Sequence, residues 1–164
     1  MCLMPTTQHL LYYYLALSKI PGIGPVTGRN LIHYVGGIEQ VFDLSEKEIQ
    51  AIPGLNLGQK RALSSKDCLK MADEEMKLAQ ENQIGILSFE SESYPYRLKQ
   101  IADAPLVLFY RGQLDLNALR TIGIVGTRNA SAMGMEYCRQ LVLGLREFGS
   151  TIVSGMAAGI DGCA

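Results

Sequence analysis

The sequence of 164 residues has almost no net charge, no paired cysteines and no apolar run long enough to cross a membrane. Its formal charge of −1 excludes a globally basic nucleic-acid-binding protein, so phosphate contacts would come from a local group of cations or from backbone amides. The four cysteines have no C-x-x-C pair and no neighbouring histidine, which argues against a zinc site and favours reduced thiols. The N-terminus lacks the basic flank and cleavage site of a signal peptide. We therefore expect a cytoplasmic protein with no metal and no membrane contact.

The chain does have enough apolar sequence for a core. Hydrophobic residues make up 48% and charged residues 19% of it, far from the composition of disordered segments. A length of 164 residues suits one ordinary domain or two small ones. Because the apolar periodicity changes near residue 82, we expect a helical domain over 1–81 and a second domain over 82–164.

The first 81 residues have the pattern of short helices separated by glycine and proline turns. Ser45 and Glu48 have the spacing of a capping box, which predicts a helix start there. The aromatics Tyr12-Tyr13-Tyr14 point in different directions on a helix, so at least one is expected in the core. The expected helices run from Thr6 or Thr7, either one a suitable N-cap, to about Ser18, then over 26–35, 38–42, 45–52 and, as one long helix, 57–81.

After residue 82 the pattern changes to short apolar runs rich in β-branched and aromatic residues, which is typical of strands. Alternating strands and helices, with continuous apolar runs in the strands, predict an α/β fold with an incomplete, mostly parallel, Rossmann-like three-layer sheet. We expect further βα units to be missing, because four strands and one long helix cannot cover both faces of such a sheet. The expected strands are 84–89, 105–110, 121–126 and 151–155, and the expected helix is 131–148, with Ser131 as N-cap, inward Cys138, Leu141, Leu145 and Phe148, and Gly149 after its end.

Two glycine-rich turns follow the last two expected strands. The first, GIVGTR, lacks the G-x-G-x-x-G spacing that surrounds a dinucleotide pyrophosphate, so we expect no NAD and no other cofactor. Glycines let the backbone approach a ligand, a planar guanidinium suits a phosphate, and helix N-termini attract anions. The alternative is that these glycines serve only tight turns and close packing. The candidate binding residues are Gly126, Thr127, Arg128 and Ser131 in the first turn and Ser154, Gly155 and Gly159 in the second.

The segment PGIGPVTGRNLI resembles a helix-hairpin-helix element, in which the turn presents backbone amides to a DNA phosphate. Gly22 and Gly24 match this turn, and Lys19 and Arg29 are close enough in sequence to add charge. A second copy, IPGLNLGQKRAL, is degraded, because Asn56 replaces its second glycine. The alternative is a vestigial hairpin used for packing or protein contacts, since the local charge is mixed.

Three ordered motifs extend over residues 94–164. IVGTRNASAMG followed by TIVSGMAAGIDGCA matches the pattern VG[ST]R-x-x-[ST]-x-x-G and VSG-x-A-x-GID, and SYPYRLKQIADAPLVLFYRG matches YP-x-x-L-x-x-I-x-D-x-P-x-x-L-x-x-x-G. In all three the chain resembles the DNA-processing protein A family, DprA or Smf. The residues that match the upstream stretch are Tyr94, Pro95, Leu98, Ile101, Asp103, Pro105, Leu108 and Gly112.

The resemblance implies an extended Rossmann domain that binds and protects single-stranded DNA and hands it to the RecA recombinase in natural transformation. It implies no catalysis, and a homodimer for the full-length protein. Carried over by position, Arg128 and the turns 126–131 and 154–161 would line the pocket for the DNA phosphates. Asp161 falls in this pocket although a carboxylate repels phosphate, so we expect it to cap the next helix or to hold Arg128.

Two other functions are open from the sequence. One is an enzyme, a nucleotide or nucleoside-monophosphate hydrolase that resembles the lysine-decarboxylase-like Rossmann proteins. Their P-G-G-x-G-T-x-x-E motif does not occur in these residues, and a helical hairpin suits DNA better than a nucleotide. The other is a protein-interaction module that has lost its ligand, and the presence of Arg128 beside two glycine turns weighs against it.

Overall fold

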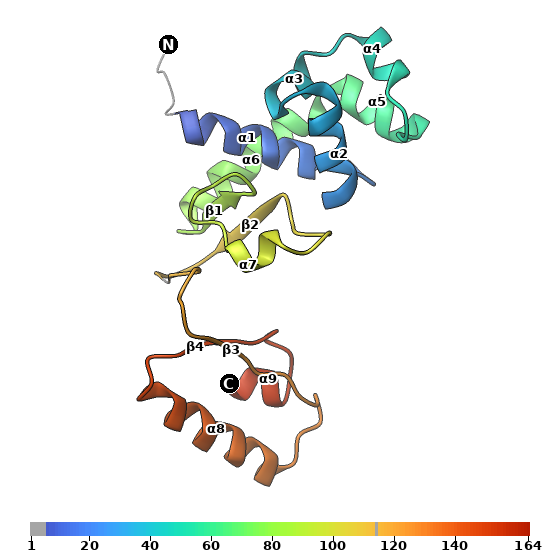
Figure 1. Cartoon of the computed structure of the whole chain (residues 1–164). Helices are drawn as coiled ribbons and strands as arrows, with labels where there is room; N and C mark the ends of the chain where they lie inside the picture. Colours follow the sequence, from blue (N-terminus) through green and yellow to red (C-terminus); the bar gives the residue numbers. More distant parts are fainter. Residues whose placement is uncertain (1–5, 114) are drawn as a thin grey trace. The chain divides into compact units, whose positions relative to one another are not determined.

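The computed structural model describes residues 6–113 and 115–164 (Figure 1). The chain divides into two compact units, Met1–Asn117 (unit 1) and Ala118–Ala164 (unit 2), each of which is described by itself. Cys2 and the side chains of the two candidate N-caps, Thr6 and Thr7, lie outside the described residues. Within the described part of the chain, no helix is both long and apolar enough to span a bilayer.

Unit 1 combines short helices with a two-stranded sheet (Figure 1). Its elements are α1 (Thr6–Ser18), α2 (Pro25–Val35), α3 (Ile38–Asp43), α4 (Glu46–Ala51), α5 (Leu57–Ser65), α6 (Asp67–Glu81), β1 (Gly85–Ser88), α7 (Tyr96–Lys99) and β2 (Val107–Tyr110). The central helix is α1, which packs against α2, α3, α6 and both strands. Leu15, Ala16 and Leu17 are fully buried, as expected for a helix that is apolar on several sides. Tyr14 is buried as well, which confirms that one of the three tyrosines belongs to the core.

The predicted helices of unit 1 are confirmed with one correction. The capping box is present: the Ser45 hydroxyl accepts a hydrogen bond from the Glu48 amide, and the Glu48 carboxylate accepts one from the Ser45 amide. The single helix predicted over 57–81 is wrong, because Lys66 adopts a left-handed conformation (φ 57°) and separates α5 from α6. The serines and the aspartate around Lys66 favour such a break, since they compete for backbone hydrogen bonds.

The strands of unit 1 differ from the expected parallel arrangement. β1 and β2 pair antiparallel, with Gly85 opposite Tyr110 and Ser88 opposite Val107. A connection that reverses the chain direction, without a crossover to the other edge, leaves its two strands antiparallel. They also pack on α1, and β1 packs on α6, so by contacts they belong with the helices. The predicted domain boundary after residue 81 stays a prediction. The two compact units of the structure divide at a different place, after Asn117.

Unit 2 has the predicted parallel strand–helix–strand arrangement (Figure 1). β3 (Thr121–Gly123) pairs parallel with β4 (Thr151–Val153), α8 (Ala132–Arg146) connects them, and α9 (Ile160–Cys163) follows β4. The N-cap is confirmed, because the Ser131 hydroxyl accepts a hydrogen bond from the Gly134 amide at 3.1 Å. Gly149 adopts the left-handed conformation (φ 59°) just beyond the helix, as its position predicts.

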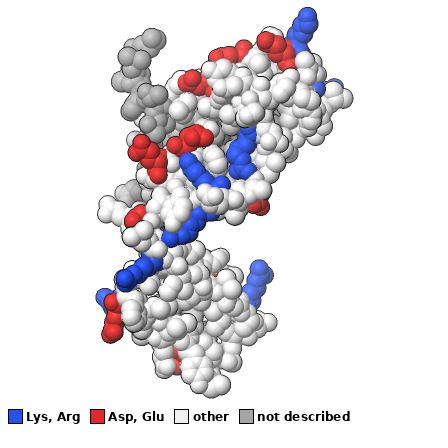
Figure 2. Space-filling model, viewed as in Figure 1, with Lys and Arg blue, Asp and Glu red and all other residues white. Residues whose placement is uncertain are grey.

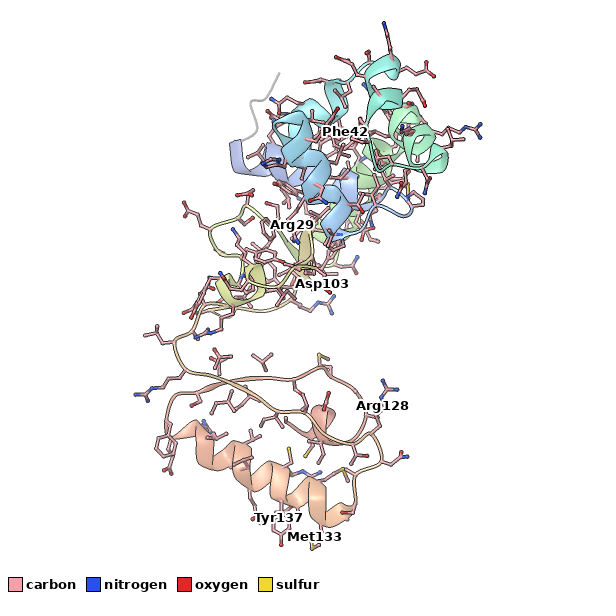
Figure 3. All side chains as sticks on the ribbon, turned by 45° about the vertical axis from the view of Figure 1, so that its right-hand side comes forward. Arg29, Phe42, Asp103, Arg128, Met133 and Tyr137 are labelled. Carbon is pink, nitrogen blue, oxygen red and sulfur yellow. The ribbon has the colours of Figure 1, made fainter. Side chains whose placement is uncertain are left out.

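The apolar stripe predicted for α8 is only partly correct. Cys138 is buried and Leu145 is half-buried, but Leu141 and Phe148 are exposed. They share an exposed face with Met133 and Tyr137, which point away from the sheet (Figure 3). Helical periodicity shows which residues share a face, but not whether a partner covers that face.

Gly28 on α2 is expected to be indispensable for packing in unit 1. A side chain there would place its Cβ 2.6 Å from Cδ1 of Leu106, which is itself buried. Gly28→Val should therefore lower the free energy of unfolding by about 1–3 kcal/mol, measured by urea denaturation followed by circular dichroism. Asn30→Val, on an exposed position of the same helix, is the control. Equal losses in the two variants would contradict the packing assignment.

Glu48 is expected to stabilise the fold in a pH-dependent way. Hydrogen bonds from the Ser45 hydroxyl and amide lower the pKa of Glu48 below its ordinary value of 4.5. Because the folded-state pKa is lower, the stabilisation is present above pH 4.5 and is lost as the pH falls through the folded-state pKa. Urea midpoints of wild type and Glu48→Gln should therefore differ at pH 7 and converge once the pH has fallen below the folded-state pKa. Glu46→Gln, in the same turn, serves as the control, and a difference that persists at low pH would oppose this account.

Candidate nucleic-acid interface

Two turns meet at the carboxyl ends of β3 and β4: the GTR turn (Gly126–Ser131) and the GID turn (Ser154–Asp161). Parallel pairing places both at the same edge of the sheet. The ladder continues past the strands, because the Ile124 amide donates to the Val153 carbonyl at 2.9 Å. The Ser154 hydroxyl then donates to the Ile124 carbonyl at 2.8 Å. The structure therefore brings the two predicted groups of residues together.

Direct backbone contact fixes the two turns against each other. The Ile160 amide donates to the Thr127 carbonyl at 3.2 Å. A Cβ on Gly126 would lie 2.5 Å from Cβ of Ile160, and a Cβ on Gly159 would collide with the Thr127 carbonyl oxygen. Gly159 also has a positive φ of 83°, which strains any other residue. Close packing thus explains these two glycines, and the same packing gives the turn its shape.

Arg128 is the exposed cation at the tip of the GTR turn. Figure 3 shows its side chain projecting outward from the loop between β3 and α8. Within residues 6–113 and 115–164, its guanidinium has no hydrogen bond, ion pair or ring contact. The amides of Arg128, Ala132 and Met133 likewise have no acceptor in that part of the chain. A free guanidinium attracts anions, and so do the unpaired amides at the start of a 15-residue helix.

Asp161 has neither of the two roles expected for it. Its Oδ1 accepts a hydrogen bond from the Gly126 amide at 3.0 Å. It makes no contact with Arg128, and the N-cap of α9 is Gly159, without a side-chain cap. The carboxylate therefore occupies one amide of the GTR turn, where it holds the turn, and leaves Arg128 free. No sequence pattern indicates this contact, because the two residues are separated by 35 positions.

The hydroxyl groups of the site differ in what they offer a ligand. The Ser154 proton is donated to Ile124, so Ser154 shapes the turn. The hydroxyl oxygens of Thr127 and Ser131 accept from the Asn129 and Gly134 amides, which leaves both O–H groups as donors. Ligand binding by these residues, and by Gly155, stays a prediction.

The hairpin turn of unit 1 is held by a residue that the sequence analysis missed. The Gln59 side chain donates to the Gly22 carbonyl at 2.7 Å, and Gly22 has a positive φ of 79°. Gln59 is fixed in turn by a second capping box with Asn56, and the N-x-x-Q spacing at 56–59 is the signal that could have revealed it. The amides of Gly22 and Gly24 have no acceptor among the described residues, so they are available to a phosphate.

The two cations predicted for this hairpin already have other contacts. Lys19 forms an ion pair with Glu75 at 2.7 Å, which neutralises its charge. Arg29 donates to the carbonyls of Ala102 and Ala104, so it lies beside the segment that carries Asp103 (Figure 3). Arg29 therefore joins α2 to the segment 102–104, which follows β1 in the chain, and its role in DNA binding stays a prediction.

Two cysteine thiols of unit 2, Cys138 and Cys163, contact backbone carbonyls. The Cys138 thiol donates a hydrogen bond to the Ile160 carbonyl, and the Cys163 thiol donates one to the Met135 carbonyl. Burial raises the pKa of the Cys138 thiol. A thiol with a raised pKa is a poor nucleophile at neutral pH. In the described part of the chain, no group of three or more His, Cys, Asp or Glu residues could hold a metal ion.

Comparisons with known proteins agree with the resemblance found in the motifs. The DNA recombination-mediator protein A family matches residues 85–164, and a SAM-like helix-hairpin-helix tandem matches residues 14–70. The protein Smf of Synechocystis sp. is 32% identical over 161 residues, which are 91% of this chain and 38% of that protein. The DNA processing protein DprA of Bacillus subtilis is 45% identical over 83 residues, 50% of this chain and 28% of that protein.

A solved structure agrees as well. The X-ray structure of DNA processing protein A from Streptococcus pneumoniae matches with a TM-score of 0.69 at 28% identity, over 94% of this chain and 52% of that one. The chain thus spans about half of that structure and just over a third of the Synechocystis protein. These matches do not favour the nucleotide-hydrolase alternative.

Gly126 is expected to be required for the contact between the two turns. Gly126→Ala should push α9 away from the GTR turn, because its Cβ would overlap Ile160. We expect faster amide hydrogen exchange at Ile160–Cys163 and a lower melting temperature, by a few degrees. Gly123→Ala is the matched control, since nothing lies within 4 Å of a Cβ at that strand position. Unchanged exchange at α9 in Gly126→Ala would refute the contact.

Proposed function

We propose, since the chain belongs to the DNA recombination-mediator protein A family, that it binds single-stranded DNA and that the GTR turn of unit 2 holds the DNA phosphates. The observation that carries this proposal is that the GTR turn leaves two kinds of anion-attracting group free: the guanidinium of Arg128, and the unpaired amides of the turn and of the first residues of α8. Bidentate contact of a guanidinium with phosphate is strong and geometrically specific.

The charges around the turn determine the kind of recognition. The anion-attracting groups are one side-chain cation, the O–H groups of Thr127 and Ser131, and backbone amides, all of which suit phosphate oxygens. The Asp161 carboxylate lies at the inner side of the turn, on the Gly126 amide, and opposes an anion there. We therefore place the phosphate at the outer side, toward Arg128. Recognition of the backbone would make binding independent of base sequence.

The remaining parts of the proposal rest on family membership. We propose that the full-length protein acts without catalysis in the cytoplasm, protects incoming single-stranded DNA and loads RecA on it during natural transformation, and that it does so as a homodimer. The relatives that support this proposal are named DNA processing protein and Smf, and the chain spans a minority of their length.

Arg128→Ala should weaken binding of a labelled oligothymidylate, measured by fluorescence anisotropy over a salt series. Loss of one charge-assisted phosphate contact should cost about 1–3 kcal/mol, uniformly across base sequences. The slope of log K against log salt should fall by about 0.7 for that contact. Arg128→Lys should retain part of the affinity, because it keeps the charge but not the planar fork.

The control is Arg146→Ala, which removes the same charge at the opposite end of α8. Its affinity should stay within about twofold of wild type, since an exposed distant charge is screened by salt. Equal affinities of wild type and Arg128→Ala at low salt would overturn the assignment of the turn. Binding that depends on base sequence would overturn backbone recognition.

A further inference from the structure

Basic side chains gather on one face of unit 1, over α2 and α7 (Figure 2). We call this set, Arg29, Arg97 and Lys99, the α2–α7 basic surface. It brings together an arginine of the helical region and two cations of the segment between β1 and β2, although 68 and 70 positions separate them in the sequence. Because the chain as a whole carries a charge of −1, such a concentration of positive charge is local.

Two of these cations share one aromatic ring. The guanidinium of Arg29 and the ammonium of Lys99 each lie 5.1 Å from the centroid of the Phe89 ring, so they are no further apart than twice that distance. Lys99 also lies 5.7 Å from the Tyr94 ring. The rings attract both cations through their faces, and in this way they hold two like charges close together.

No carboxylate pairs with Arg29 or Lys99 among the described residues. The donors of Arg29 bind the neutral carbonyls of Ala102 and Ala104, which fix the guanidinium but leave its charge uncompensated. Glu90 and Asp103 are chain neighbours of residues that contact Arg29. Glu90 is engaged by the Tyr14 hydroxyl, whose pKa rises to about 12 through burial and through this carboxylate, and Asp103 is exposed.

An exposed aromatic residue lies at the edge of the surface. Tyr96 is 47% exposed, and Arg97 lies 4.6 Å from the centroid of its ring. Exposed aromatic rings beside cations are typical of surfaces that bind single-stranded nucleic acids, because a base can stack while the phosphates meet the charges. An acidic protein segment would use the cations but would gain nothing comparable from the ring.

We propose that the α2–α7 basic surface is a second contact for single-stranded DNA, in which Lys99 and Arg97 bind phosphates and Tyr96 stacks on a base. This inference rests on the proposed function, because it takes the ligand to be the same strand that binds the GTR turn. The contribution of unit 1 to DNA binding then lies on this surface. Arg29 acts there as a positioning residue that holds the 102–104 segment. Two contacts on one chain raise the affinity for oligonucleotides long enough to reach both.

The test compares Arg97→Ala/Lys99→Ala with Lys47→Ala/Lys77→Ala, which removes the same charge from exposed positions of α4 and α6. Each is measured in the wild-type and the Arg128→Ala background, with oligothymidylates of about 10 and 40 nucleotides, after circular dichroism has verified folding. We expect the first variant to bind the long oligonucleotide at least tenfold more weakly, with a salt slope smaller by about 1.4. In the Arg128→Ala background it should remove the remaining binding, and the control variant should do neither.

Tyr96→Ala against Tyr96→Phe tests the stacking, because only the alanine variant loses the ring. We expect a several-fold loss for alanine and none for phenylalanine. If Arg128→Ala weakens binding but the Arg97/Lys99 variant matches its control, the second contact is refuted and the proposed function stands. If Arg128→Ala has no effect, the GTR assignment fails independently. If polyglutamate competes for the surface as strongly as DNA does, the surface binds acidic protein and the inference is overturned.

Discussion

The close approach of two backbone turns is the constraint on which the candidate site depends. Gly126 and Gly159 allow the GTR and GID turns to touch, and the Asp161 carboxylate fastens them through the Gly126 amide. The turn held in this way carries Arg128 and leads into α8, which begins at the Ser131 N-cap. The Asp161 carboxylate already occupies the Gly126 amide on one side of the GTR turn. The other side carries the unpaired amide and the free guanidinium of Arg128. The position of the anion site therefore follows from packing as much as from charge.

In unit 1 a comparable constraint joins residues of two sequence domains. Arg29 on α2 binds the carbonyls on both sides of Asp103, and Gly28 makes room for Leu106. The helical region and the segment after residue 82 thus fold as one compact unit, although two separate family models match them. The α2–α7 basic surface depends on this contact between the two regions, since neither region alone supplies both Arg29 and Lys99.

Local signals in the sequence predicted the local structure well. The capping box at Ser45, the N-cap at Ser131 and the parallel βαβ arrangement of unit 2 were all readable, because each depends on neighbouring residues or on regular periodicity. The break at Lys66 and the antiparallel pairing of β1 and β2 were not predicted, because the apolar periodicity continues across Lys66 and a short apolar run does not show the direction in which its strand pairs. Arg128 was predicted as a phosphate ligand of the turn, which stays a prediction, whereas the partner of Asp161 and the role of Gln59 depend on contacts between residues far apart in the sequence.

Amide chemical-shift mapping tests the central claim most directly. The ¹⁵N-labelled 164-residue chain is titrated with oligothymidylate at low and at physiological salt, and each amide is followed by NMR. The account predicts the largest shifts at Arg128, Ala132 and Met133, whose amides are unpaired, with smaller shifts at the Gly126 amide, which Asp161 already holds. Saturable binding that leaves these amides unshifted would contradict the account.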